Sequence, residues 1–133
     1  MARLNANPNA EASVDFAVIK PGIYRMRVEE ITEFISAKSG NTCWKVRLAY
    51  VDPSALSKED GSPAGNVGNV FDNSLVIAPA DKQGKTRGFV EALGAQWSDL
   101  DSEDLIGLEC DCRVGIEEYQ GNKKNVIARY LKK

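Results

Sequence analysis

The 133-residue chain contains no histidine, and this absence excludes whole classes of enzyme. Ser-His-Asp triads, Cys-His dyads and HExxH zinc sites all require an imidazole side chain. Carboxylate-only chemistry, as in glycosidases or magnesium-dependent nucleases, stays open because the chain has 19 acidic residues. The composition therefore excludes these histidine-dependent enzyme classes and leaves carboxylate chemistry open.

Cysteine is scarce, and the three thiols Cys43, Cys110 and Cys112 are an odd number. Cys110 and Cys112 are two residues apart in an alternating segment, so they share one face of a strand. With only one further thiol and no histidine, they lack the four ligands that structural zinc usually takes. We expect reduced, buried cysteines and no metal site.

Long apolar runs are also missing, and the first residues lack the apolar core of a secretory signal. A chain of this length, with 43% hydrophobic and 27% charged residues, suits one ordinary globular domain. We expect a mobile arm over residues 1–20, a single domain over 21–133, an intracellular location and no membrane association.

Positive charge is unevenly distributed in a chain whose formal net charge is -2. Residues 20–47 carry six cationic and three acidic side chains, and residues 119–133 carry five cationic and no acidic ones. The remainder is therefore strongly acidic. Such segregation predicts a positive face on an acidic molecule, which favours a polyanionic partner and repels it from the opposite face.

Five segments are expected to form strands, and all but the third show the alternation of apolar and polar residues, with a period of two, that is typical of half-buried strands. They cover residues 23–34, 43–51, 70–77, 108–119 and 125–131. The spacing of apolar residues predicts a helix over 85–96, between the third and fourth strands, with Gly94 as its C-cap. Residues 52–68 are rich in proline and glycine and predict a long exposed loop or lid.

Three strands, a helix and two strands form the element order of the OB-fold, a mainly β, five-stranded Greek-key barrel that binds oligonucleotides. Short motifs occur in the same order: Pro21-Gly22-Ile23-Tyr24, Lys38-Ser39-Gly40-Asn41, Ala92-Leu93-Gly94, Leu105-Ile106-Gly107 and Tyr119-Gln120-Gly121-Asn122. Together they resemble a phage-encoded family, long labelled as of unknown function, whose members look like OB-fold single-stranded DNA-binding proteins. The resemblance spans roughly residues 20–131.

This resemblance implies sequence-independent binding of single-stranded DNA in phage replication or recombination, in the cytoplasm of an infected bacterial host. It implies neither an enzymatic activity nor a cofactor. The partners expected are single-stranded DNA, replication or recombination proteins of the phage, and a second copy of the chain.

Single-stranded DNA binding needs cations that follow phosphates and aromatic rings on which bases stack. Alternation places four cations on the polar face of the first hairpin, with Lys38 at its tip, and it places Tyr119 outward beside the last basic stretch. Trp44 lies on the same face of its strand as predicted core residues, and the register of the strand that contains Phe71 is open. Both rings are therefore weaker candidates for base stacking than Tyr119. The predicted site comprises Arg25, Arg27, Lys38, Trp44, Lys45, Arg47, Phe71, Tyr119, Lys123, Lys124 and Arg129.

The residues leave three alternatives open. The first is a module of the same fold that docks a replication or recombination enzyme without contacting DNA. The second is a metal-dependent nuclease that uses the acidic group Asp99, Asp101, Glu103 and Asp104. The third is single-stranded RNA as the ligand, because stacking and phosphate contacts do not by themselves select the sugar.

Overall fold

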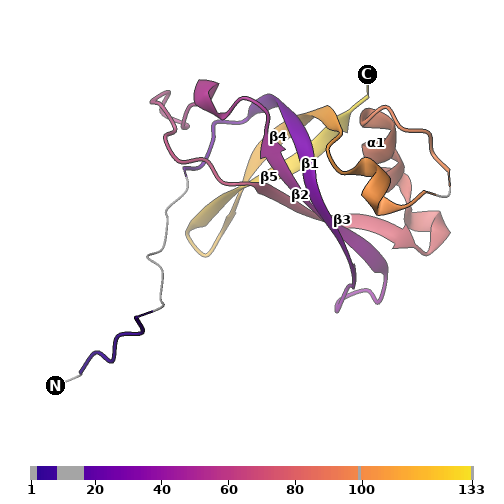
Figure 1. Cartoon of the computed structure of the whole chain (residues 1–133), viewed down its shortest axis with the longest axis horizontal. Helices are drawn as coiled ribbons and strands as arrows, with labels where there is room; N and C mark the ends of the chain where they lie inside the picture. Colours follow the sequence, from indigo (N-terminus) through magenta and orange to yellow (C-terminus); the bar gives the residue numbers. More distant parts are fainter. Residues whose placement is uncertain (1–2, 9–16, 99, 133) are drawn as a thin grey trace.

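The computed structural model describes residues 3–8, 17–98 and 100–132, and its main elements are five strands and one helix (Figure 1). The elements are β1 (Gly22–Ile35), β2 (Thr42–Tyr50), β3 (Val70–Ala78), α1 (Gly84–Ala92), β4 (Glu109–Tyr119) and β5 (Asn122–Leu131). Short 3₁₀ turns occupy Pro53–Ala55, Ala80–Lys82 and Ser102–Leu105. The predicted mainly β composition and element order are confirmed.

Helix α1 is shorter than the predicted span of 85–96. It ends at Ala92, and Gly94 adopts a φ of +81°, in the left-handed region that glycine enters without steric cost. The Gly94 N–H donates to the Glu91 carbonyl at 3.0 Å, which satisfies one of the last acceptors of the helix. Within the described part of the chain, no helix has the length and apolar character needed to cross a bilayer.

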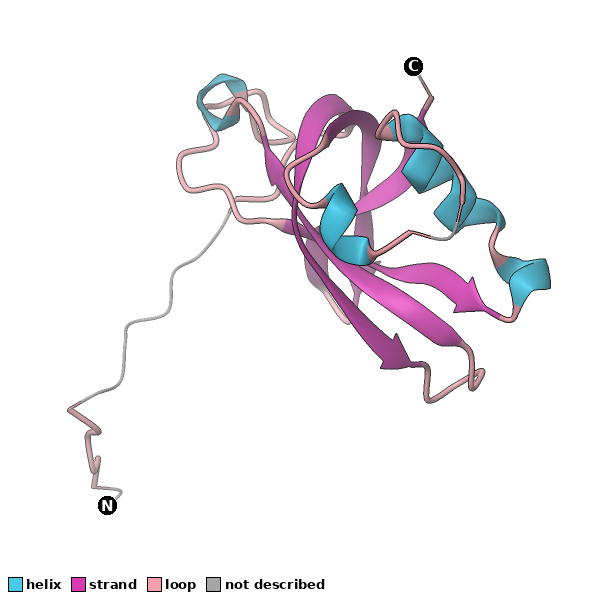
Figure 2. Cartoon of the chain, turned by 45° about the vertical axis from the view of Figure 1, so that its right-hand side comes forward, coloured by secondary structure: helices cyan, strands magenta, loops and turns pink. Residues whose placement is uncertain are grey.

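The five strands form one antiparallel sheet in the order β3-β2-β1-β4-β5. Strand β4 returns to lie beside β1, which is the Greek-key arrangement. Helix α1 and the turns around it lie on one side of the sheet (Figure 2).

The sheet is not closed into the barrel that the element order predicted. Strands β3 and β5 are its two edges, and they do not form a ladder with each other. Helix α1 contacts both edges, and the Phe89 and Tyr130 rings lie 4.9 Å apart between centroids. Side-chain packing between α1 and the two edge strands therefore connects the edges in place of backbone hydrogen bonds.

A buried carboxylate also connects these edges. Asp72 on β3 is 6% exposed and accepts hydrogen bonds from the Tyr130 hydroxyl and the Ser74 hydroxyl, each at 2.6 Å. The Lys85 Nζ lies 3.2 Å from Asp72 Oδ2. Burial acts to raise the pKa of Asp72, but the hydrogen bonds from Ser74 and Tyr130 and the charge of Lys85 together hold that pKa below its ordinary value. We call these four residues the Asp72 cluster.

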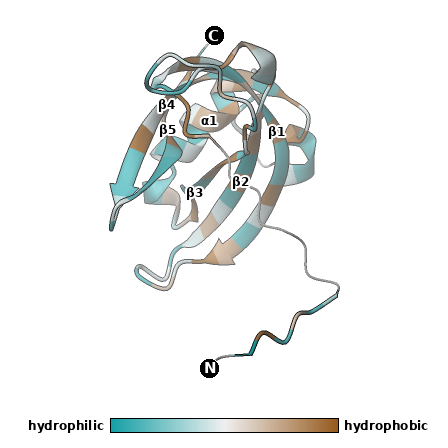
Figure 3. Ribbon diagram, turned by 90° about the vertical axis from the view of Figure 1, so that its left-hand side faces the viewer, coloured by the Kyte–Doolittle hydropathy of each residue, from teal (hydrophilic) through white to brown (hydrophobic). Residues whose placement is uncertain are grey.

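Apolar and polar residues alternate along much of the sheet as predicted (Figure 3). Met26 and Val28 on β1 and Cys110 and Cys112 on β4 are fully buried. The three cysteines, all within the described residues, form no disulfide and are buried, as expected for small apolar residues.

The predicted alternation of Val126, Ala128 and Tyr130 on β5 is wrong in part. Val114 of β4 pairs with Ile127, whereas Arg113 pairs with Arg129, so Ala128 is an extra residue in the ladder. This bulge resets the alternation. Ile127 and Tyr130 are buried as a result, and Ala128 is exposed.

Residues 17–20, within the predicted mobile arm, pack against the sheet. Ile19 is 1% exposed, its N–H donates to Asn125 Oδ1 at 2.8 Å, and its carbonyl accepts from Asn125 Nδ2 at 2.8 Å. Residues 9–16 of that arm lie outside the described residues. The loop over 52–68 is exposed along much of its length, but Leu56 and Ala64 are buried in the core and anchor it.

Candidate functional site

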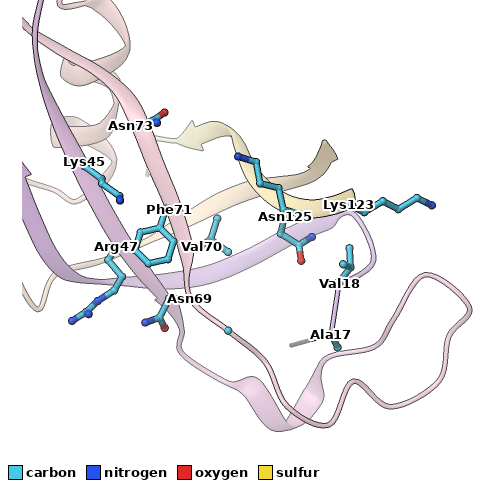
Figure 4. Close-up of a pocket in the computed structure, with 12 residues that line it drawn as sticks. Ala17, Val18, Lys45, Arg47, Asn69, Val70, Phe71, Asn73, Lys123 and Asn125 are labelled. Atoms are coloured by element: carbon cyan, nitrogen blue, oxygen red, sulfur yellow. The ribbon is translucent and has the colours of Figure 1, made fainter. Parts of the chain in front are cut away.

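A groove of about 590 Å³ has strands β2 and β3 on one side and the first residues of β5 on the other (Figure 4). Residues 17–18 contribute to the β5 side. Among the described residues, none that lines the groove is acidic. The groove brings together five predicted site residues, which we call the basic groove: Lys45, Arg47, Phe71, Lys123 and Lys124.

Strands β2 and β3 supply one wall. Val46 and Leu48 are fully buried, so the alternating positions Lys45 and Arg47 point away from the core. Phe71 is the cross-strand partner of Arg47 and is 51% exposed, an unusual position for a phenyl ring. The Lys45 Nζ lies 5.1 Å from the centroid of this ring, within the range of a cation–π contact.

The β4–β5 hairpin supplies the opposite wall. Gln120 and Gly121 have φ values of +51° and +81°, and this pair of positive values is typical of a two-residue hairpin turn whose twist matches its strands. Lys123 and Lys124 are the second and third residues of β5, which begins directly after this turn. The turn therefore determines where both ammonium groups lie relative to β3.

The cations of the basic groove differ in how they are neutralised. Arg47 Nη2 lies 3.3 Å from Glu30 Oε2, and Lys123 Nζ lies 3.5 Å from Glu59 Oε2 in the 52–68 loop. All four of these side chains are 40% or more exposed, so both pairs are screened by water and weak. Lys45 and Lys124 form no ion pair within the described ranges. The groove therefore keeps a net positive charge.

Arg25 and Arg27 are outward, as predicted, but they lie outside the basic groove. Arg25 contacts Glu109 and Asp111 of β4, each at 3.4 Å, and Arg27 Nη2 lies 2.8 Å from Glu29 Oε1. Both arginines lie in the part of β1 that pairs with β4, and β2 separates β1 from β3. Their charges are balanced by carboxylates on the same surface.

The other four predicted site residues are dispersed over the molecule. Lys38 is exposed in the β1–β2 turn, and Tyr119 is 71% exposed at the end of β4 without lining the groove. Trp44 is half-buried and packs against the core beside Trp97. Arg129 lies near α1, in a depression that also includes Glu91 and Lys132.

Two exposed asparagines that the sequence analysis did not select also line the groove. Asn69, directly before β3, and Asn73, within it, flank Phe71 at intervals of two residues (Figure 4). The alternation of outward Asn69, Phe71 and Asn73 with buried Val70 and Asp72 is present in the sequence. It was obscured by the adjacent apolar residues Leu75, Val76 and Ile77, which left the register of this strand open.

The acidic group considered for a metal does not form a metal-binding cluster among the residues that the structure describes. Asp101 instead accepts the Glu103 N–H at 3.2 Å and caps the short 3₁₀ turn at Ser102–Leu105. Asp99 lies outside the described residues.

Comparison of the chain with models of known protein families finds no match, and comparison with the sequences of characterised proteins finds none either.

Proposed function

We propose that the protein binds single-stranded DNA along the basic groove, with little sequence preference and no covalent step. One observation carries this proposal. Four cations and a half-exposed phenyl ring line the same groove, and none of the described residues that line it carries a carboxylate. Cations that follow phosphates and a ring on which a base stacks are the two elements of sequence-tolerant single-strand binding. The groove combines both on facing walls.

We further propose that the fold is of the OB type. The Greek-key strand order and the helix between β3 and β4 support this assignment. OB-folds bind oligonucleotides over their second and third strands and through the loop between the fourth and fifth, which correspond to the two walls of the basic groove. The resemblance described above makes phage DNA replication or recombination the proposed setting.

A titration of a fluorescent dT oligonucleotide at several salt concentrations tests the proposal. Single strands release about 0.7 counterions per neutralised phosphate, so four groove cations predict a log–log slope of about -3. Absence of binding at low salt, or a preference for duplex DNA, would contradict the proposed function. Cleavage of the oligonucleotide on addition of magnesium would instead support a nuclease.

Replacing Phe71 with leucine is expected to weaken binding roughly 5- to 100-fold, because one stacked base contributes about 1 to 3 kcal/mol. Leucine keeps an apolar side chain at this exposed position but removes the aromatic face. The measurement is the same titration, in which the salt slope should stay unchanged because the ring contacts no phosphate.

Ile35→Ala is the matched control, since Ile35 is a 71% exposed apolar residue at the end of β1 and does not line the groove. Equal affinities of the Phe71→Leu variant and the wild type would show that no base stacks on this ring.

A further inference from the structure

Two amide side chains lie on either side of the stacking ring. Successive outward positions of a strand are about 7 Å apart, so Asn69 and Asn73 stand one such step before and after Phe71. Figure 4 shows Phe71 and Asn73 on β3 and Asn69 directly before this strand, with Arg47 beside the ring on the neighbouring strand. A base lying flat on the phenyl face would therefore have an amide near each end of its plane.

These two amides are free to bind a ligand. In the described part of the chain, neither the Asn69 nor the Asn73 side chain forms a hydrogen bond, and both are exposed. Asn125, the third asparagine that lines the groove, differs because its amide is used to hold Ile19 and also donates to the Gly115 carbonyl at 3.2 Å. The groove is thus lined by one asparagine whose side chain has a structural role and by two whose side chains are available to a ligand.

A carboxamide presents one acceptor and two donors side by side. The Watson–Crick edge of every unpaired base also presents a donor next to an acceptor, and unstacked bases are commonly recognised on this edge. An amide can rotate by half a turn to match either order of donor and acceptor. It can therefore bind any base while still requiring that the base edge be free.

We propose that the amide on the side to which the Watson–Crick edge of the stacked base points, which is Asn69 or Asn73 according to the polarity of the strand, hydrogen-bonds that edge and thereby selects unpaired bases over duplex. This inference rests on the proposed function, because it assumes that a nucleotide occupies the groove. Duplex DNA has its Watson–Crick edges occupied by the complementary strand, so neither amide would find a partner there.

The test uses the shortest dT oligonucleotide that binds with full affinity, so that the strand has one register on the protein. At one position at a time, thymine is replaced by difluorotoluene, which has the shape and stacking face of thymine but scarcely any hydrogen bonding. In a second series, an abasic site replaces the same nucleotide. Affinities are measured for the wild type, for the Asn69→Ala/Asn73→Ala double variant, and for Gln96→Ala, an exposed amide outside the groove.

At the position that contacts Phe71, difluorotoluene should weaken binding to the wild type and to Gln96→Ala by roughly 3- to 10-fold, the effect of one hydrogen bond. It should change binding to the double variant by less than about twofold, and that variant should also discriminate less between single-stranded and duplex DNA. An equal loss in wild type and double variant, or no loss in either, would overturn the inference.

The abasic series distinguishes failure of the inference about the amide contacts from failure of the proposed function. If an abasic site weakens binding and difluorotoluene does not, stacking in the groove stands and the amide contacts are excluded. If the wild type does not bind the oligonucleotide at all, the proposed function fails and the inference fails with it.

Discussion

Charge reversal of Lys123 and Lys124 to glutamate is expected to lower the affinity for single-stranded DNA by about 100-fold at low salt, or about 2.7 kcal/mol. The double variant loses two of the four cations of the basic groove and places two carboxylates where phosphates would lie, and like charges at an interface repel strongly. The salt slope should become less steep by about 1.4, from two lost phosphate contacts. Anisotropy titrations over a range of salt measure both quantities.

Lys123 also pairs with Glu59, so its reversal places two carboxylates next to each other and disturbs the 52–68 loop. The single variant Lys124→Glu avoids this effect because Lys124 has no ion pair in the described part of the chain, and it should weaken binding about tenfold. Lys82→Glu/Lys132→Glu is the control with the same net charge, at two exposed positions that do not line the groove. Equal losses in both double variants would show that only the overall charge matters and that the groove is not the site.

Replacing Asp72 with alanine is expected to lower the free energy of unfolding by about 3 kcal/mol, because the buried hydroxyl of Tyr130 and the hydroxyl of Ser74 lose their acceptor. Lys85 is 39% exposed, so its ion pair with Asp72 is screened and adds little to this loss. The melting temperature should fall by roughly 10 °C. Chemical and thermal denaturation followed by circular dichroism measure the change.

The Asp72 cluster also predicts a pH dependence of stability. The pKa of Asp72 is held below its ordinary value of 3.8, so the folded state favours the charged carboxylate. The resulting stabilisation is fully present above pH 3.8, and it is lost as the pH falls through the lower pKa of the folded state. The difference in stability between wild type and Asp72→Ala should therefore narrow in that acidic range.

Tyr130→Phe provides the companion measurement. It removes one hydroxyl from the Asp72 cluster and keeps the ring that packs on Phe89, so it should cost about 1 kcal/mol. If Asp72→Ala were as stable as the wild type, the packing of α1 alone would hold the two edges of the sheet together.

Alternation along a strand is a local property, and where pairing is regular it could be predicted from the sequence. Cys110, Cys112 and Val114 on β4 are buried at intervals of two, as the pattern indicated. On β5 the same rule failed at Ala128, because a bulge arises from the pairing of two strands and leaves no mark in the period of one of them.

The candidate site shows the same division between local and long-range information. The sequence indicated that Arg25 points outward, but the carboxylates that neutralise it, Glu109 and Asp111, lie 84 and 86 positions further along the chain. The same applies to the basic groove. Phe71 on β3 lines it together with Lys123 and Lys124 on β5, the strand at the opposite edge of the sheet. Which outward charges meet carboxylates and which remain available is thus decided by strand order.

The sequence by itself determined a mainly β chain of five strands with a helix between the third and fourth, and the outward direction of Lys45 and Arg47. Those features follow from backbone period and turn chemistry, which act over a few residues. Only the tertiary structure decided that the sheet stays open at β3 and β5, that Arg25 is neutralised, and that Phe71 faces the basic groove. These outcomes depend on packing and ion pairs between side chains that are distant in the sequence. A local sequence pattern contains no information about such contacts.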